Sequence, residues 1–344
     1  MAETPFPGAR VTLVSPFPRQ VYSGMVPGFV AGHYMLDDCV IPLAPLATRA
    51  KAGFIEGSAV QLDAQNRQVT LADGEVLHYD ALSLDTGPAM NRDAIPGARE
   101  HALFVRPIEA FTRLWDSVLE LASQRILSVV VVGAGAAGVE LSMALQHRLG
   151  ERARVSLVTG GPPPLPSHSL KVQARVLRAL KRCGVTLLED ACTEITASHV
   201  VLQRGMRLAC DAPVLAIGAS APAWLAASGL ALDEQGFVAT TATLQSSSHP
   251  EVFAAGDVAA RLDAPRPRSG VFAVRAGPPL ALNLRRFIGG GPLQPYMPQP
   301  NALNLLACGG RRAIGSYADW SVEGRWVWWW KNRIDRNFIA AYRE

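Results

Sequence analysis

The stretch Val129–Glu140, VVVVGAGAAGVE, constrains the fold more than any other part of this sequence. Four consecutive valines are typical of a strand that is buried on both faces, and three glycines at G-x-G-x-x-G spacing follow them directly. A run with helical spacing, residues 136–149, comes next. Strand, glycine turn and helix in this order predict a parallel βαβ unit whose turn binds a dinucleotide.

The three glycines of this turn are expected to have separate tasks. Gly133 makes the tight turn, Gly135 lets the backbone approach a pyrophosphate, and Gly138 lets the helix pack close to the sheet. The ribose-binding position at the end of the next strand reads Thr159-Gly160, which is neither acidic nor basic. The choice between NAD and NADP therefore stays open, with NAD slightly favoured because no arginine follows directly.

The surrounding residues extend this unit into a larger α/β domain. Strands are expected at 126–132, 154–158 and 185–188, helices at 136–149 and 169–183, and a helix at 107–123 opens the domain. A helical run at 271–288 contains Pro278-Pro279, and this pair predicts a kink or the true start of the helix. The predicted class is α/β, with three layers and two Rossmann-like dinucleotide-binding domains.

Composition and charge exclude several functional classes. A net charge of +4 with no basic stripe argues against nucleic acid as a partner. The five cysteines contain no C-x-x-C and the seven histidines are scattered, so no disulfide framework, metal site or Ser-His-Asp triad is expected. The N-terminus lacks a secretory signal, and the long uncharged runs are short or broken by Pro and Gly. The expected location is the cytoplasm.

Three further motifs support a resemblance to a known superfamily. Two apolar strands that end in glycine, 81–87 and 214–218, are followed by AAGDVA at 254–259. In this order they resemble the pyridine nucleotide-disulfide oxidoreductase superfamily, and within it the type II NADH dehydrogenases and sulfide:quinone oxidoreductases. The stretches 22–34, 274–286 and 324–335 further resemble the flavoprotein that is fused ahead of selenophosphate synthetase, which implies a link to selenium metabolism.

The resemblance implies a domain division. Residues 1–105 and 245–295 would form an FAD-binding-like domain that is interrupted by an NAD(P)-binding domain, 106–244. Residues 296–344 would form a C-terminal interface region.

The resemblance also implies roles for individual residues. Asp257, after Gly256, would accept a hydrogen bond from FAD, and a helix beginning near Gly270 would point its N-terminal end at the flavin ring. Glu140 is expected where nicotinamide and flavin meet, and is the one candidate catalytic side chain. The remaining candidate cofactor contacts are Tyr22, Pro27, Thr86, Gly87, Gly218 and Arg275, of which Arg275 could equally be a surface arginine paired with an acid.

One part of the family pattern is not matched. Family members begin with a strand and a glycine loop that bind the FAD pyrophosphate, whereas residues 10–15 resemble the second strand of that domain. We expect an N-terminally truncated chain, because a sheet without its central strand leaves backbone groups unpaired. Whether FAD binds without the first loop stays open.

These features favour an FAD-dependent NAD(P)H oxidoreductase. It would pass electrons from the nicotinamide nucleotide through the flavin to a quinone or to a small sulfur or selenium acceptor. The alternative is a non-catalytic nucleotide-binding regulatory module that has lost FAD binding. The sequence also leaves open whether the protein forms a homodimer.

The tail is rich in tryptophan and basic residues. Trp326, Trp328, Trp329 and Trp330 lie next to Lys331, Arg333 and Arg336. Aromatic and basic residues together suit a peripheral contact with the inner face of a membrane, but they equally suit an interface with another domain. Cys39 follows two aspartates, which disfavour its thiolate, so it is expected to be an unreactive buried residue.

Overall fold

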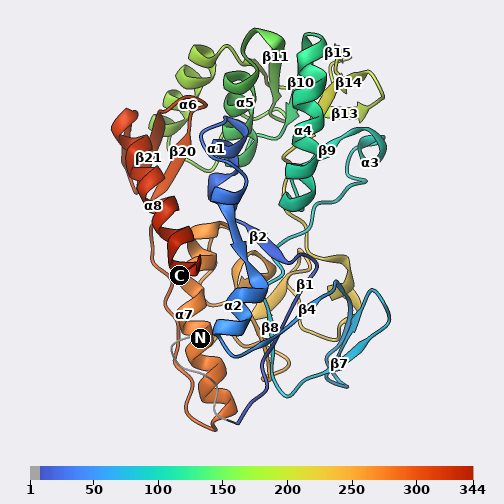
Figure 1. Cartoon of the computed structure of the whole chain (residues 1–344), viewed down its shortest axis with the longest axis vertical. Coiled ribbons are helices and arrows are strands. Elements are labelled where there is room, and N and C mark those ends of the chain that lie inside the picture. The colour runs from blue at the N-terminus through green and yellow to red at the C-terminus, as the bar shows by residue number, and fades with distance from the viewer. Residues whose placement is uncertain (1–7, 344) are drawn as a thin grey trace.

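The computed structural model describes residues 8–343 and consists of two lobes with a C-terminal appendage (Figure 1). The chain begins in the lower lobe, from which α1 (Val26–Val30) reaches up to α5 (Ala136–Leu149) of the upper lobe. It crosses to the upper lobe after β8 (Leu82–Leu84) and returns to the lower lobe before α7 (Gly270–Ile288). One lobe is therefore inserted in the other.

The inserted lobe is built on a five-stranded parallel sheet with the order β12-β11-β10-β16-β9. Its strands are β9 (Leu103–Phe104), β10 (Leu127–Val132), β11 (Ala153–Val158), β12 (Thr186–Leu188) and β16 (Ala212–Leu215). The helices α4 (Ile108–Gln124), α5 (Ala136–Leu149) and α6 (Leu170–Cys183) connect them, and a 3-10 turn occurs at Gly150–Arg152. The 3-10 turn Ala223–Ala227 packs in the core of the other lobe through Leu225. The predicted alternation of strands and helices is confirmed to within a few residues.

Both faces of this sheet are buried because β10 carries apolar side chains on both sides. Leu127, Val129 and Val131 pack with the helices, whereas Val130 and Val132 pack against the opposite layer. That layer is an antiparallel meander of β13 (Cys192–Ile195), β14 (His199–Leu202) and β15 (Arg207–Ala209), together with α3 (Ala98–His101). The run of valines thus becomes the centre of a three-layer unit.

The other lobe contains several short sheets. Parallel pairs are formed by β1 (Thr12–Ser15) with β4 (Gly53–Glu56), β8 (Leu82–Leu84) with β18 (Val252–Ala254), and β17 (Val238–Thr240) with β19 (Ala259–Arg261). β2 (Arg19–Val21) pairs antiparallel with β3 (Val40–Pro42), and β5 (Ala59–Asp63), β6 (Gln68–Leu71) and β7 (Val76–His78) form a meander. The short helices are α1 (Val26–Val30) and α2 (Leu43–Arg49), with 3-10 turns at Ser23–Met25, Asp37–Cys39 and Gly256–Val258.

The long helix α7 (Gly270–Ile288) corrects one expectation. It begins at Gly270 and continues through Pro278 and Pro279, so the prolines do not mark its start. They cannot donate backbone hydrogen bonds within the helix. Burial of Ala276, Leu280 and Leu284 holds the helix against the lobe despite this loss.

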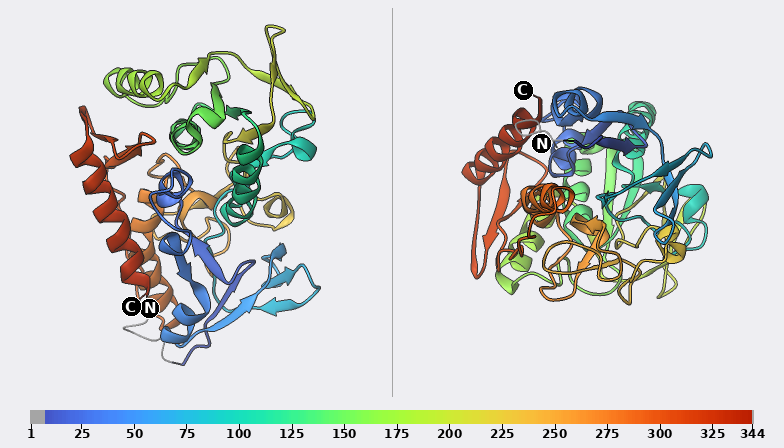
Figure 2. Two further views of the ribbon diagram at one scale, coloured as in Figure 1. Left: turned by 45° about the horizontal axis from the view of Figure 1, so that its top comes forward. Right: turned by 90° about the horizontal axis from the view of Figure 1, so that it is seen from below.

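The C-terminal appendage is more regular than the sequence indicated. β20 (Asn304–Ala307), β21 (Ala313–Tyr317) and β22 (Trp320–Gly324) form an antiparallel sheet, and α8 (Arg325–Arg343) follows directly. Figure 2 shows α8 running along one side of the molecule. Among residues 8–343, no helix is both long enough and apolar enough to cross a bilayer.

Candidate functional site

The glycine turn after β10 is packed so closely that two of its positions exclude any side chain. A Cβ on Gly133, whose φ is 142°, would overlap the carbonyl oxygen of Ala216, and a Cβ on Gly138 would overlap the carbonyl of Gly133. Around Gly135 a Cβ would meet nothing within 4 Å. The turn thus leaves open space at the start of α5, where a helix N-terminus attracts phosphate. Nucleotide binding by these glycines stays a prediction.

The loop after β11 carries no charge that selects a ribose. Thr159 is buried, and among the described residues its hydroxyl has no hydrogen-bond partner. Gly160 and Gly161 have positive φ and open space where a Cβ would be. The loop then folds back, and the Leu165 N–H donates to the carbonyl of Ala134 in the glycine turn (2.8 Å). NAD and NADP therefore remain alternatives.

The two strand-plus-glycine motifs meet where the lobes are joined. Ala89 and Ser220 exchange backbone hydrogen bonds of 2.8 and 2.9 Å, and this bridge follows Gly87 on one strand and Gly218 on the other. Thr86 is exposed next to Gly87. The carboxyl ends of β8 and β16 therefore face a common region, which is where α/β sheets bind ligands.

Asp257 lies at the same junction. Its carboxylate is 3.8 Å from the Arg106 guanidinium, which comes from the inserted lobe, and burial raises its pKa. Gly256 has a φ of 70°, and a Cβ there would press on the Cβ of Ala273 in α7 at 3.3 Å. This close packing brings Asp257 next to the N-terminal part of α7.

The start of α7 has an unsatisfied polar group. Ser269 is its N-cap, and within residues 8–343 its hydroxyl is buried without a hydrogen-bond partner. A Cβ on Gly270 would lie 4.0 Å from the Ser23 hydroxyl. The helix terminus and the loop at Tyr22–Pro27 are therefore neighbours.

Other predicted residues of this group are placed differently. The Tyr22 ring packs on Phe338 of α8 at 4.5 Å, and a hydrogen bond to Asp335 contributes to its raised pKa after burial. Pro27 is buried in the first turn of α1. Arg275 lies on an exposed part of α7, and no ion pair of it occurs among the described residues. Contact of these three residues with a cofactor stays a prediction.

Glu140 belongs to a buried polar cluster that the sequence did not indicate. Its carboxylate accepts the Ala307 N–H (2.7 Å), and burial raises its pKa to about 7 while the Lys331 ammonium opposes this shift. Lys331 donates to the Gly24 carbonyl (2.6 Å) and to Asp335 (2.7 Å). The i,i+4 spacing of Lys331 and Asp335 in the tail was the one available signal.

The sulfur and metal-ligand chemistry of the chain is limited. Burial and the neighbouring Asp38 raise the pKa of Cys39 to about 12, in agreement with its expected low reactivity. Cys183 and Cys192 are half-buried rather than core residues. Within residues 8–343, no three His, Cys, Asp or Glu side chains are grouped as metal ligands.

Comparison with known proteins gives the family. The family model described as pyridine nucleotide-disulphide oxidoreductase matches residues 2–277. An NADH dehydrogenase-like protein of Mycobacterium tuberculosis is 31% identical over 242 residues, which are 66% of this chain and 60% of that protein. The demethylphylloquinone reductase of Synechocystis is 26% identical over 320 residues, covering 89% and 78% of the two chains. This chain thus spans about 60% of the length of its mycobacterial relative.

Solved structures agree with this fold. The sulfide:quinone oxidoreductase of Aquifex aeolicus superposes with a TM-score of 0.81 at 20% identity, covering 97% of this chain and 85% of that one. Its likeness confirms the predicted architecture of two dinucleotide-binding domains. Taken with the family match, it shows that this chain belongs to the pyridine nucleotide-disulphide oxidoreductase family.

Proposed function

We propose that this protein is an FAD-dependent NAD(P)H oxidoreductase that passes electrons to a quinone or to a small sulfur or selenium acceptor. The observation that carries the proposal is the junction of the lobes. Two contacts join the lobes there, the Ala89–Ser220 bridge and the Arg106–Asp257 ion pair. The glycine turn of the inserted lobe lies on one side of this junction, and Asp257 with the start of α7 lies on the other. Residues 106–244 would hold the nicotinamide nucleotide, and 1–105 with 245–295 the flavin.

The residues at the start of α7 fit a flavin. The Ser269 hydroxyl lacks a hydrogen-bond partner among residues 8–343. Gly256 lets its loop pack closely on Ala273 of α7, and the next residue, Asp257, carries a hydrogen-bond acceptor. A helix N-terminus also stabilises negative charge that develops near it. A bound FAD would supply the hydride and electron chemistry, which no side chain of the protein can provide. The protein's part is to bind and orient the two cofactors.

Glu140 is the group best suited to move a proton at this site. A carboxyl group with a pKa of about 7 is close to equally charged and neutral at neutral pH, as a general acid requires. The Ala307 N–H holds one of its oxygens, and Lys331 stabilises the charge that remains after a proton leaves. We infer that Glu140 supplies a proton when the acceptor is reduced.

Replacing Glu140 by glutamine tests this role. We expect NADH-dependent reduction of a soluble quinone to fall by roughly 100-fold, the usual contribution of one general acid. In the unmodified protein the rate should decline as pH rises through about 7, because the acid form is lost there. The variant should lack this decline. Glu120→Gln, which changes an exposed carboxylate on α4, is the control, and an unchanged pH profile in Glu140→Gln would contradict the proposal.

The same carboxyl group should also make stability depend on pH. Because burial raises its pKa from 4.5 to about 7, the folded state holds a proton that the unfolded state releases between these values. Its contribution to stability is therefore full below pH 4.5 and is lost as pH rises through 7, by up to about 3 kcal/mol. Urea denaturation at several pH values should show a smaller loss in Glu140→Gln. Equal losses in both proteins would contradict the shifted pKa.

The visible absorption spectrum tests the function as a whole. The protein is purified without added cofactor and examined before and after incubation with FAD. We expect a flavin band that bleaches when NADH is added without oxygen. A flavin band that NADH does not bleach would contradict hydride transfer between the two lobes.

The strand pairing of the flavin lobe favours a second candidate function. β1 pairs with β4 and β8 with β18, and among the described residues no strand joins these two pairs. A lobe with this gap suits a non-catalytic module that binds only the nicotinamide nucleotide. Colourless protein that binds NADH but takes up no FAD would support this candidate instead.

The exposed face of α8 supports a peripheral membrane contact. Trp326 and Trp329 are each 54% exposed, Trp330 is 37% exposed, and the exposed Arg333 lies one helical turn further along α8. Trp326 stacks on Trp330 at 6.4 Å. An aromatic face with basic residues suits the interface of an anionic bilayer. We infer that this face contacts the lipid phase in which a quinone acceptor would be dissolved.

Sedimentation with vesicles tests this contact. Replacing Trp326, Trp329 and Trp330 together by alanine should reduce binding to phosphatidylglycerol vesicles by at least about tenfold, because each exposed indole contributes apolar area. Trp320→Ala, which removes an equally exposed tryptophan from β22, is the matched control and should bind normally. Equal binding of all three proteins would show that the α8 face does not contact lipid.

A further inference from the structure

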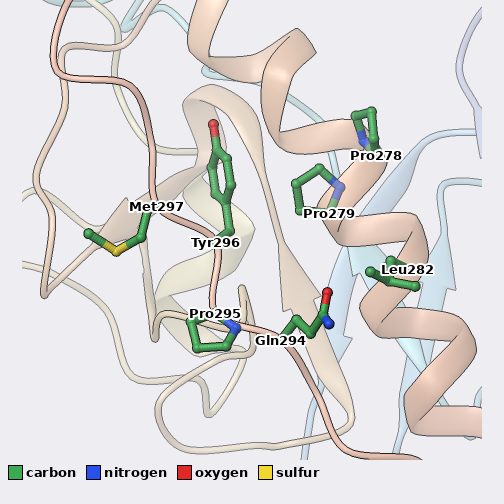
Figure 3. A pocket seen from close by; sticks show the side chains of 7 residues that line it. All are labelled: Pro278, Pro279, Leu282, Gln294, Pro295, Tyr296 and Met297. Atoms are coloured by element: carbon green, nitrogen blue, oxygen red, sulfur yellow. The ribbon is translucent and has the colours of Figure 1, made fainter.

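A cavity of about 330 Å³ lies beside the middle of α7, at Pro278, Pro279 and Leu282 (Figure 3). Its apolar lining consists of Pro278, Pro279 and Leu282 from the helix, and Pro295 and Met297 from the segment that follows it. The volume is at the lower end of the range for small-molecule sites. The proposed flavin and nicotinamide contacts do not include these residues.

Tyr296 forms one wall of this cavity and has an unsatisfied hydroxyl group. Figure 3 shows its side chain pointing along the space between the segment and α7. Its hydroxyl oxygen is buried, and within residues 8–343 it has no hydrogen-bond partner. A buried polar atom without a partner is costly, so a ligand that pairs with it gains affinity.

A second, smaller cavity on the other side of Tyr296 is lined by arginines. Arg261 donates to the Tyr296 carbonyl (3.0 Å), and its guanidinium lies 5.8 Å from the ring centroid. Arg266 lines the same cavity. Burial raises the pKa of Tyr296, and the charges of Arg261, Arg275 and Arg266 act in the opposite direction.

The charges around Tyr296 do not cancel. Arg261 is held by Asp263 through contacts of 2.9 and 2.8 Å, and Asp257, which also lines the smaller cavity, faces Arg106. The remaining arginine of the cavity, Arg268, is paired with Asp233 at 3.4 Å.

Two arginines of this region have no acidic partner among the described residues. Arg266 and Arg275 have no carboxylate partner in the part of the chain that the structure describes. Arg275 is one helical turn before Pro278 and Pro279, so it lies on the same side of α7 as the apolar cavity. The region therefore combines unpaired positive charge, a free hydroxyl group and an apolar cavity.

We propose that this region is a binding site for a small organic anion with one anionic group and a short apolar body. The anionic group would accept hydrogen bonds from Arg266, Arg275 and the Tyr296 hydroxyl, and the body would fill the proline-lined cavity. Asp257 and Asp263 do not repel such a ligand strongly, because each already faces an arginine. The smaller cavity is also lined by Gly256 and Asp257, so the site borders the proposed flavin site, whereas its proline-lined cavity lies outside it.

Calorimetry with hexanoate, using 1-hexanol as a neutral probe of similar shape, tests the site. We expect hexanoate to bind at least about tenfold more tightly than hexanol, because a charge-assisted hydrogen bond is lost in the alcohol. Arg266→Gln and Arg275→Gln should each weaken hexanoate binding by roughly tenfold, and Tyr296→Phe by a few-fold. Both arginines are exposed, so neither substitution should affect folding. Arg178→Gln, on α6 of the inserted lobe, is the control.

The outcomes separate this site from the proposed enzyme. Saturating FAD should leave hexanoate binding unchanged, and displacement by FAD would overturn the proposal by assigning the arginines to the flavin phosphates. Equal binding of hexanoate and hexanol, or an Arg178→Gln effect as large as that of Arg266→Gln, would also overturn it. Flavin reduction by NADH is measured separately, so either proposal can fail without the other.

Discussion

Gly133→Ala is expected to destabilise the protein by about 2–4 kcal/mol and to abolish NADH binding. A Cβ at this position would overlap the Ala216 carbonyl, and the backbone φ of 142° is unfavourable for any residue with a side chain. The clash involves backbone atoms of the neighbouring strand, so no side-chain movement can relieve it. Urea denaturation and NADH titration by fluorescence measure the two effects.

Gly135→Ala separates the binding effect from the folding effect. Since a Cβ on Gly135 meets nothing within 4 Å, this variant should fold with nearly normal stability. It should still bind NADH at least about tenfold less tightly, because the methyl group occupies the space through which a pyrophosphate approaches. Gly277→Ala, at another open glycine, controls for the general effect of alanine in place of glycine. Normal NADH binding by Gly135→Ala would contradict the assignment of this turn.

The inserted lobe could be predicted because its signals are local. Four valines, three glycines and a helical run are contiguous, and the observed α5 spans the predicted residues 136–149. Gly184, with a φ of 78°, ends α6 directly after the predicted helix 169–183, as a glycine often does at a helix C-terminus. In this region the sequence period and the tertiary packing require the same structure.

The C-terminal appendage was not predictable from such signals. β21 and β22 are joined by Ala318 and Asp319, and Ala318 adopts a φ of 47° in place of the Asn or Gly that marks such turns. In α7, tertiary burial outweighs the two prolines that ordinarily interrupt a helix.

The candidate site was predicted only in part, because its contacts join distant segments. Glu140 was singled out for its place after the glycine turn, but its partners Ala307 and Lys331 come from the appendage. Tyr22 was singled out as a flavin contact, which stays a prediction, but its hydrogen bond to Asp335 of α8 was not foreseen. Such contacts depend on how α8 packs on the lobes, and no sequence period encodes that packing.

The ion pair of Lys331 and Asp335 is the second place where a single substitution should have a large effect. Both side chains are at most 9% exposed, and the pair is 2.7 Å apart. Asp335→Ala removes the hydrogen-bonded carboxylate partner of a buried ammonium group, whose other hydrogen bond goes to the neutral Gly24 carbonyl and which then has only the nearby Glu140 charge. We expect a loss of about 3–5 kcal/mol in the free energy of unfolding, measured by urea denaturation.

Two further variants show whether the unpaired charge is the cause. Asp319→Ala removes an exposed aspartate from the neighbouring turn and should cost less than about 0.5 kcal/mol. The double variant Lys331→Met, Asp335→Asn removes both charges and nearly keeps both side-chain volumes, so it should recover most of the stability that Asp335→Ala loses. If the double variant were as unstable as Asp335→Ala, the loss would come from packing between α8 and the lobes. If the double variant does recover the stability, each member of the pair compensates the charge of the other, which becomes buried close to Glu140 when α8 packs on the lobes.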